Sequence, residues 1–138
     1  MKTMITIGLA IALSGSAYAS GFKCTSDEGL NVKLFNHVDP LSGTRTPAVL
    51  VISSDAQGTL IVRKDTEITK HNRANTVQYV VDGSEKVGAE TAILQIRFKE
   101  GREVLEAREV TAAQLILVSE DNDRSVIALE CERYLKAE

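Results

Sequence analysis

Several short stretches of the chain alternate apolar and polar residues with a period of two, which is typical of a β-strand with one buried face. In the clearest of them, Leu94, Ile96 and Phe98 alternate with polar residues. Two other stretches are almost continuously apolar. The predicted strands, in chain order, are 30–34, 48–52, 59–63, 68–70, 76–81, 94–99, 103–107, 115–119 and 125–132.

Turn-forming residues separate these stretches, and most connections are short, which favours pairing between consecutive strands. Eight to nine short strands in one chain predict an all-β fold, either a small antiparallel β-barrel or a β-sandwich. Aromatic residues make up only 4% of the chain and Trp is absent, so the core is expected to consist mainly of Val, Ile and Leu.

The segment 101–114 admits two interpretations, because it is rich in the helix formers Glu, Ala, Arg and Leu. A helix from Val104 to Leu115 would place Arg108 on the same stripe as apolar residues, so it would lack a clean apolar face. The pattern therefore favours a strand at 103–107, then a loop and a second strand. The helix remains the alternative.

The first nineteen residues have the three parts of a secretory signal peptide. Lys2 supplies the positive charge, 4–13 is apolar, and Ser14-Gly15-Ser16 precedes the small-x-small sequence that ends at Ala19. The apolar run is too short to span a bilayer, which needs about 20 residues. We expect cleavage between Ala19 and Ser20, and a single exported β-domain over 20–138.

Several features favour a soluble product in the periplasm or the external medium. Lys23 stands before Cys24 where a lipoprotein signal needs a small residue, and no other segment is long and apolar enough to span a membrane. Cleavage would lower the net charge from −3 to −4, because Lys2 is the only charged residue removed. This acidic balance gives no support for nucleic-acid binding, which needs a basic face.

The chain contains two cysteines, Cys24 and Cys131. In an oxidising compartment an even number of cysteines predicts a disulfide, and with two the pairing is forced. Such a bond would join the first and last strands, an arrangement that suits a barrel. A redox or metal-binding pair is the alternative, although there is no Cys-x-x-Cys motif and neither cysteine has a neighbouring His.

The sequence shows no catalytic, cofactor or metal motif. Its two histidines, His37 and His71, lie in polar contexts without a nucleophile motif, and 83–88 lacks the ending of a phosphate-binding loop. The segment Asp121-Asn122-Asp123 has alternating oxygen ligands but lacks the Gly and Glu of a calcium loop, so it is interpreted as a turn. We therefore expect a protein that is not an enzyme and holds no cofactor or metal.

The long connection 36–47 is the first candidate for a binding loop, because long loops in compact domains often carry function. A plain connection is the alternative. Its candidate binding residues are His37, Asp39, Ser42, Thr44 and Arg45. The polar segment 71–75, interpreted as a loop, is the second candidate.

The overall plan resembles that of periplasmic inhibitors of C-type lysozymes: a Phe-x-Cys sequence after the signal, a small β-domain and a cysteine near the end. Those inhibitors carry a Ser-Gly-x-x-Tyr/Lys loop. Ser42-Gly43-Thr44-Arg45 matches its first part, but Thr46 stands where the key side chain would be, and the segment comes earlier in the chain. The resemblance therefore concerns the overall arrangement of the chain and not the complete loop sequence.

The leading hypothesis is a non-catalytic exported domain that binds a protein or a cell-envelope component through its loops. One alternative is a carrier of a small ligand in an apolar barrel lumen. The other, implied by the resemblance, is an inhibitor of lysozyme-like enzymes. An enzyme that uses dispersed carboxylates would require two acids to meet in space.

Overall fold

The computed structural model describes residues 18–38, 45–82, 89–103, 105 and 108–137 of the chain. These residues form nine strands and one short 3₁₀ helix, and all strand pairs are antiparallel. The elements are β3 (Tyr18–Thr25), β4 (Leu30–Val38), β5 (Arg45–Ser54), β6 (Gly58–Lys64), η1 (Asp65–Glu67), β7 (Thr69–Arg73), β8 (Thr76–Asp82), β9 (Thr91–Phe98), β10 (Val110–Val118) and β11 (Arg124–Ala137).

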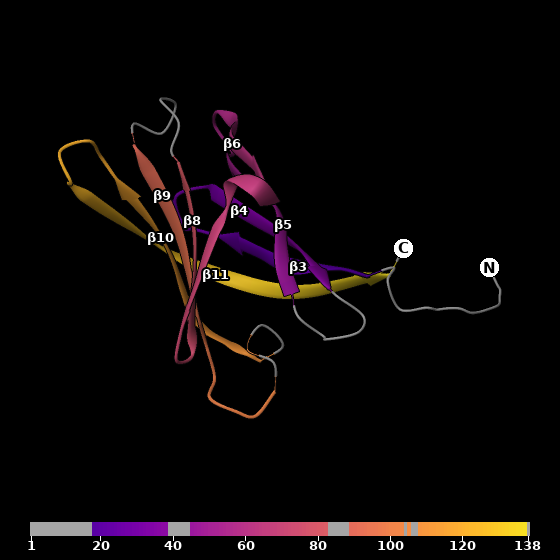
Figure 1. Cartoon of the computed structure of the whole chain (residues 1–138). Helices are drawn as coiled ribbons and strands as arrows, with labels where there is room; N and C mark the ends of the chain where they lie inside the picture. The colour runs from indigo at the N-terminus through magenta and orange to yellow at the C-terminus, as the bar shows by residue number, and fades with distance from the viewer. Residues whose placement is uncertain (1–17, 39–44, 83–88, 104, 106–107, 138) are drawn as a thin grey trace.

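The strands form one curled, half-barrel sheet in the order β6-β5-β4-β3-β11-β10-β9-β8-β7. The first and last strands, β3 and β11, therefore lie side by side in the middle of the sheet. Its two edges are β6 and β7, which follow each other in the chain and are joined through η1. We call β3–β6 the first half-sheet and β7–β10 the second; Figure 1 shows them on either side of β11.

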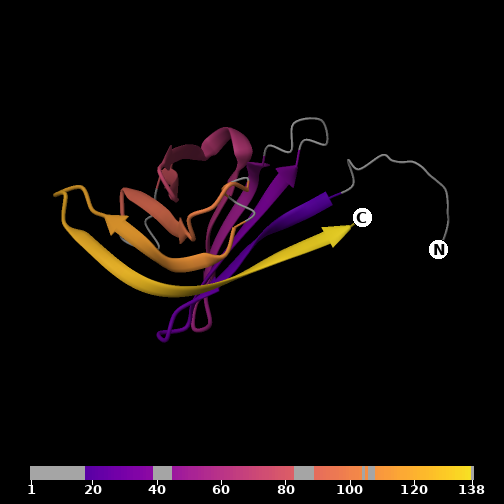
Figure 2. The same ribbon diagram turned by 90° about the horizontal axis from the view of Figure 1, so that it is seen from below.

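The long strand β11 belongs to both half-sheets. Its residues from Arg124 to Leu129 pair with β10, and those from Glu130 to Ala137 pair with β3. Figure 2 shows the strand as a continuous arc that bends between the two partners. The bend brings the inner faces of the half-sheets toward each other, and their apolar side chains pack in the space between them.

The inner face is filled by apolar side chains from both half-sheets, as the period-two pattern predicts. Phe22 of β3 and Phe98 of β9 are fully buried, and their ring centroids lie 5.7 Å apart. The other side chains of this core with at most 1% exposure are Cys24, Val32, Leu34, Leu50, Ile52, Ile61, Val77, Tyr79, Val81, Ala92, Leu94, Ile96 and Leu115. Fully burying each large aliphatic or aromatic side chain stabilises the fold by about 1.5 to 3 kcal/mol.

The predicted disulfide between Cys24 and Cys131 is confirmed. The two residues are direct partners in the pairing of β3 with β11, and their Cα atoms are 4.0 Å apart. Cys131 lies immediately after the point where β11 passes from β10 to β3. The bond therefore joins the two ends of the chain where the half-sheets meet.

The predicted all-β fold is confirmed, and two local predictions are wrong. The return strand expected at 103–107 is absent from the residues described there; the partner of β9 is β10, which begins only at Val110. The strand assignment from Val110 also excludes the alternative helix from Val104 to Leu115. The polar segment 71–75 is not wholly a loop, because β7 continues to Arg73 and leaves only Ala74 and Asn75 as the turn.

Residues 1–17, which make up most of the predicted signal peptide, lie outside the described residues. Tyr18 and Ala19 begin β3 and pair with Ala137 and Lys136 of β11. Cleavage between Ala19 and Ser20 would remove these two pairs and the pairing of Ala19 with His37 of β4, and would leave the rest of β3 in place. The cleavage itself stays a prediction. In the described part of the chain, no helix has the length and apolar character needed to cross a membrane.

Candidate functional site

The first candidate loop is described only at its two ends. His37 lies in β4, where its backbone pairs with Ala19 and Thr46, and Arg45 begins β5 opposite Val38. Strands β4 and β5 thus form a hairpin around this connection. Asp39, Ser42 and Thr44 lie outside the described residues, so a binding role for this loop stays a prediction.

Asn36, at the described end of β4, is a buried polar residue that the sequence did not single out. Its side chain is 3% exposed, and neither of its amide atoms has a hydrogen-bond partner among the residues that the structure describes. It follows Leu34 on the inner face and sits beside a β-bulge, opposite Ser20 and Pro47. Leaving such a group buried and unpaired costs about 1 to 3 kcal/mol. Buried polar side chains without a hydrogen-bond partner are unusual in folded proteins.

The second candidate segment, 71–75, lies at the end of a larger polar surface on the outer face of the second half-sheet. His71 of β7 is opposite Gln78 of β8, which is opposite Gln95 of β9, which in turn is opposite Gln114 of β10. Directly opposed residues in antiparallel strands project from the same face. We call Gln78, Gln95 and Gln114, with His71 at the β7 end, the glutamine row.

A second row runs parallel to the glutamine row, two residues further along each strand. In it, Arg73 is opposite Thr76, Thr76 is opposite Arg97, and Arg97 is opposite Ala112. We call these four residues the arginine row, and both rows together the polar face. The inner neighbours of this face, Leu94 and Ile96, are fully buried, so the polar face points away from the core.

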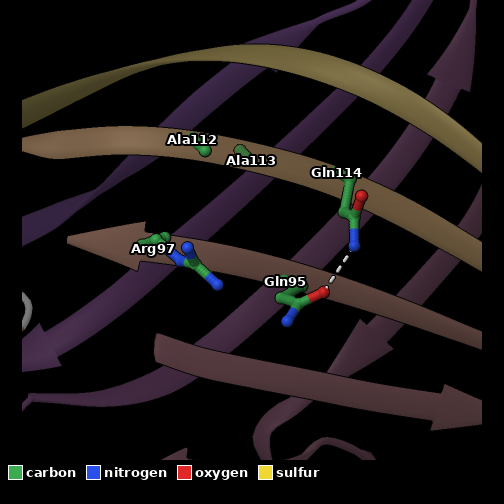
Figure 3. Close-up of a pocket in the computed structure, with 5 residues that line it drawn as sticks. All are labelled: Gln95, Arg97, Ala112, Ala113 and Gln114. Carbon is green, nitrogen blue, oxygen red and sulfur yellow. Dashed lines mark hydrogen bonds between the residues drawn. The ribbon is translucent and has the colours of Figure 1, made fainter. Parts of the chain in front are cut away.

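Two hollows lie over the polar face and share Gln95 and Arg97. The larger one has a volume of about 690 Å³, and its lining consists of His71, Asn72, Arg73, Ala74, Asn75, Thr76, Gln78, Gln95 and Arg97. The smaller one has a volume of about 220 Å³ and is lined by Gln95, Arg97, Ala112, Ala113 and Gln114. Because the linings share these two residues, the hollows adjoin each other across the strands, and together we call them the depression. Figure 3 shows the smaller hollow, with the first half-sheet behind it.

Hydrogen bonds fix several parts of this depression. Gln114 donates from Nε2 to Oε1 of Gln95 at 2.6 Å, a bond seen in Figure 3 between the two strands. At the end of the β7–β8 hairpin, Asn75 donates from Nδ2 to the carbonyl oxygen of Phe98 at 3.0 Å, and the Phe98 N–H donates to the Asn75 carbonyl at 2.8 Å. The three glutamines of the row are half-buried rather than fully solvated.

The charge of the depression is opposite in sign to that of the chain. Among the described residues of the two linings, the charged side chains are Arg73 and Arg97, and there is no Asp or Glu, whereas the whole chain carries a net charge of −3. Neither guanidinium has an ion pair or hydrogen bond to any residue in the described part of the chain. Their planar N–H groups are therefore available to an anionic partner, which arginine binds in bidentate geometry.

The turn at the rim of the depression is strained. Ala74 has a φ angle of 51°, in the left-handed region that a residue with a Cβ atom rarely adopts. Such a conformation costs about 1 to 3 kcal/mol and often occurs at functional sites. Asn75 is held in place by its paired bonds to Phe98, so the turn keeps this shape.

The sequence alone did not reveal this site. Its residues come from strands far apart in the chain, and Gln95 and Gln114 are 19 positions apart. The outward polar positions of each strand were visible, but their alignment depends on strand register, which the sequence pattern does not specify. The polar segment 71–75 was the one signal that pointed toward it.

Among the described residues, no group of three or more His, Cys, Asp or Glu side chains is placed to hold a metal ion. The chain matches no protein family, no curated protein and no solved structure.

Proposed function

We propose that this protein is a non-catalytic binding module that acts outside the cytoplasm and holds a polar cell-envelope component or protein against its polar face. The observation that carries this proposal is the depression over β7–β10, whose lining combines amides with two unpaired arginines. The glutamines of this lining are half-buried, and Gln95 and Gln114 are hydrogen-bonded to each other, whereas polar side chains on an ordinary solvated strand surface are exposed.

The chemistry of the lining supports binding rather than catalysis. Nucleophilic catalysis uses a Ser, Thr, Cys, Lys or carboxylate group beside a base. Among the described residues of the two linings there is no Ser, Cys, Lys, Asp or Glu. The one Thr, Thr76, is opposite Arg73 and Arg97 rather than a base. His71 is exposed and faces Gln78 across the hairpin. Amides and arginines donate and accept hydrogen bonds without changing their own covalent state, as a recognition site requires.

The packing of the inner face supports surface binding over the alternative of a lumen carrier. A carrier needs an apolar cavity of a few hundred cubic ångströms. Here Phe22, Tyr79 and Phe98 are fully buried among the aliphatic core side chains between the half-sheets. The two hollows are lined mainly by side chains of the outer face.

The connection 36–47 is the second candidate binding region, in keeping with the resemblance of plan to lysozyme inhibitors. The specific observation in its favour is Asn36 at the base of this hairpin, whose buried amide has no hydrogen-bond partner in the described part of the chain. A ligand or partner reaching this amide would remove its desolvation penalty.

Hydrogen–deuterium exchange in the presence of a cell-envelope extract tests the proposal and separates the two regions. We expect slower exchange at 71–78 and 95–97, where a bound ligand would cover the backbone. Slower exchange confined to 36–47 would mean that the binding site is the connection 36–47 and not the polar face. Unchanged exchange in both regions would contradict a binding role.

The matched control is the double variant Arg73→Ala/Arg97→Ala. Both side chains are exposed, so the substitutions leave the core intact. We expect the variant to keep the wild-type exchange rates when no extract is present. The protection caused by the extract should disappear from 71–78 in this variant.

A further inference from the structure

The spacing and chemistry of the two rows on the polar face indicate which kind of polar envelope component binds there. We propose that the polar face binds an extended β-linked glycan that carries an acidic group on every second sugar, lying across strands β7–β10. This inference rests on the proposed binding function and adds the ligand class.

The glutamine row crosses the sheet perpendicular to its strands. Neighbouring strands lie about 4.8 Å apart, so one side chain of the row meets the ligand at each such step. This interval is close to the length of one pyranose unit in an extended β-linked chain. An extended peptide repeats about every 3.4 Å and turns alternate side chains away, so it would fall out of register with the row.

The amide groups of the row suit sugar hydroxyl and acetamido groups. A glutamine side chain presents two N–H donors and a carbonyl acceptor, and a hydroxyl group both donates and accepts. Gln95 and Gln114 are already oriented by the bond between them. The ordering cost on binding is therefore lower than for free side chains.

The arginine row is the reason why the ligand is expected to carry acidic groups. Arg73 on β7 and Arg97 on β9 are separated by the single strand β8, which places their backbones roughly 10 Å apart at two strand spacings. That distance corresponds to two sugars along a chain lying parallel to the glutamine row. A carboxylate or phosphate on every second sugar would thus meet one guanidinium each time.

The charge distribution favours an anionic ligand over a neutral one. A neutral glycan would leave the two arginines without an anionic partner. Both line the larger hollow, whose described lining residues include no Asp or Glu, although the whole chain has an excess of acidic residues. An anion bound here is attracted by these two cations, while the rest of the surface repels it on balance.

The test is a titration of the ¹⁵N-labelled full chain, disulfide intact, followed by two-dimensional NMR. The probe is a hyaluronan hexasaccharide, a β-linked glycan with a carboxylate on every second sugar. A neutral chitin hexasaccharide and a hexapeptide of glutamate are the comparison ligands. We expect the hyaluronan probe to shift the backbone signals of 71–78, 95–97 and 112–114, and to bind about tenfold or more tightly than the chitin probe.

Two double variants separate recognition from general charge. Arg73→Ala/Arg97→Ala should weaken binding of the hyaluronan probe by about tenfold or more. Lys23→Ala/Lys33→Ala removes the same charge from the outer face of the first half-sheet and should change the affinity by about twofold at most, because exposed distant charges are screened. Spectra without ligand that differ from the wild type only near the substituted residues would show that both variants remain folded.

Three results would overturn the inference: equal binding of the chitin probe, tighter binding of the glutamate peptide, or no shift with any probe at millimolar concentration. If one of these occurs while the envelope extract still protects 71–78, the ligand class is wrong and the binding function stands. If the extract also gives no protection there, the polar face is not a binding site.

Discussion

The outer faces of the two half-sheets are built on the same backbone plan and carry different chemistry. On the first, Lys23 is opposite Lys33, and Glu132 of β11 lies on the other side of Lys23. All three are exposed and include both signs of charge, as on an ordinary solvated strand. On the second, Gln95 and Gln114 are half-buried and hydrogen-bonded to each other over a depression.

The difference shows which part of each strand the fold constrains. Both half-sheets bury apolar residues on the inner face, because the shared core requires it. The outer positions are not needed for that core, so their residues are free to serve another purpose. On the second half-sheet, half-buried amides and unpaired arginines occupy a surface where fully solvated charges would be sufficient for stability.

Breaking the covalent link between the half-sheets should have the largest effect. The disulfide closes a loop with a sequence separation of 107 residues, which corresponds to about 4 to 5 kcal/mol in the chain-entropy model. We expect the double variant Cys24→Ala/Cys131→Ala to lower the free energy of unfolding by about this amount, measured by urea denaturation. Both half-sheets should unfold in one transition, since they share β11 and the core.

A loss of less than about 1 kcal/mol would contradict this role of the bond, because the predicted effect is several times larger. Two separate unfolding transitions would show that the half-sheets are independent, so that each outer face would belong to its own folding unit. The wild-type protein under the same conditions is the reference for the free energy of unfolding and for the number of transitions.

A smaller effect is expected from a close approach in the first half-sheet. A Cβ atom at Gly21 would overlap the backbone carbonyl oxygen of Leu34 in β4, so Gly21→Ala forces the two strands apart. We expect it to lower the free energy of unfolding by about 2 to 3 kcal/mol, as overpacking does. Binding at the polar face of folded protein should be unchanged.

Gly58→Ala is the matched control for this substitution. Gly58 has a φ of 77° with no atom within 4 Å of an added Cβ, so only backbone strain opposes the alanine there. We expect a loss of about 1 kcal/mol. A Gly21→Ala variant as stable as Gly58→Ala would mean that β3 and β4 are not packed as closely as described.

Much of the fold was predictable because burial follows the period-two pattern. In β8 and β9 the inward residues Val77, Tyr79 and Leu94 have no exposed surface, and their alternation with polar residues is visible in the sequence. The disulfide was predictable because two cysteines allow one pairing. These features depend on the local pattern of apolar residues or on the number of cysteines.

The rest depends on contacts that local pattern does not contain. The edge strand β7 has exposed or half-exposed side chains throughout, so its continuation to Arg73 has no apolar period to reveal it. The stretch 103–107 contains residues compatible with a strand, but β9 pairs with β10 instead. The polar face requires the register of four strands at once, which only the folded sheet provides.

On the proposed function, the outer face of the second half-sheet binds an envelope ligand and the outer face of the first half-sheet does not. The most direct measurement is co-sedimentation of the protein with an insoluble cell-envelope fraction, comparing Arg73→Ala/Arg97→Ala with Lys23→Ala/Lys33→Ala. Each variant removes two positive charges, so general electrostatic attraction changes equally. We expect the arginine variant to lose about tenfold in affinity while the lysine variant sediments like the wild type. Equal losses in both variants, or no loss in either, would contradict the account.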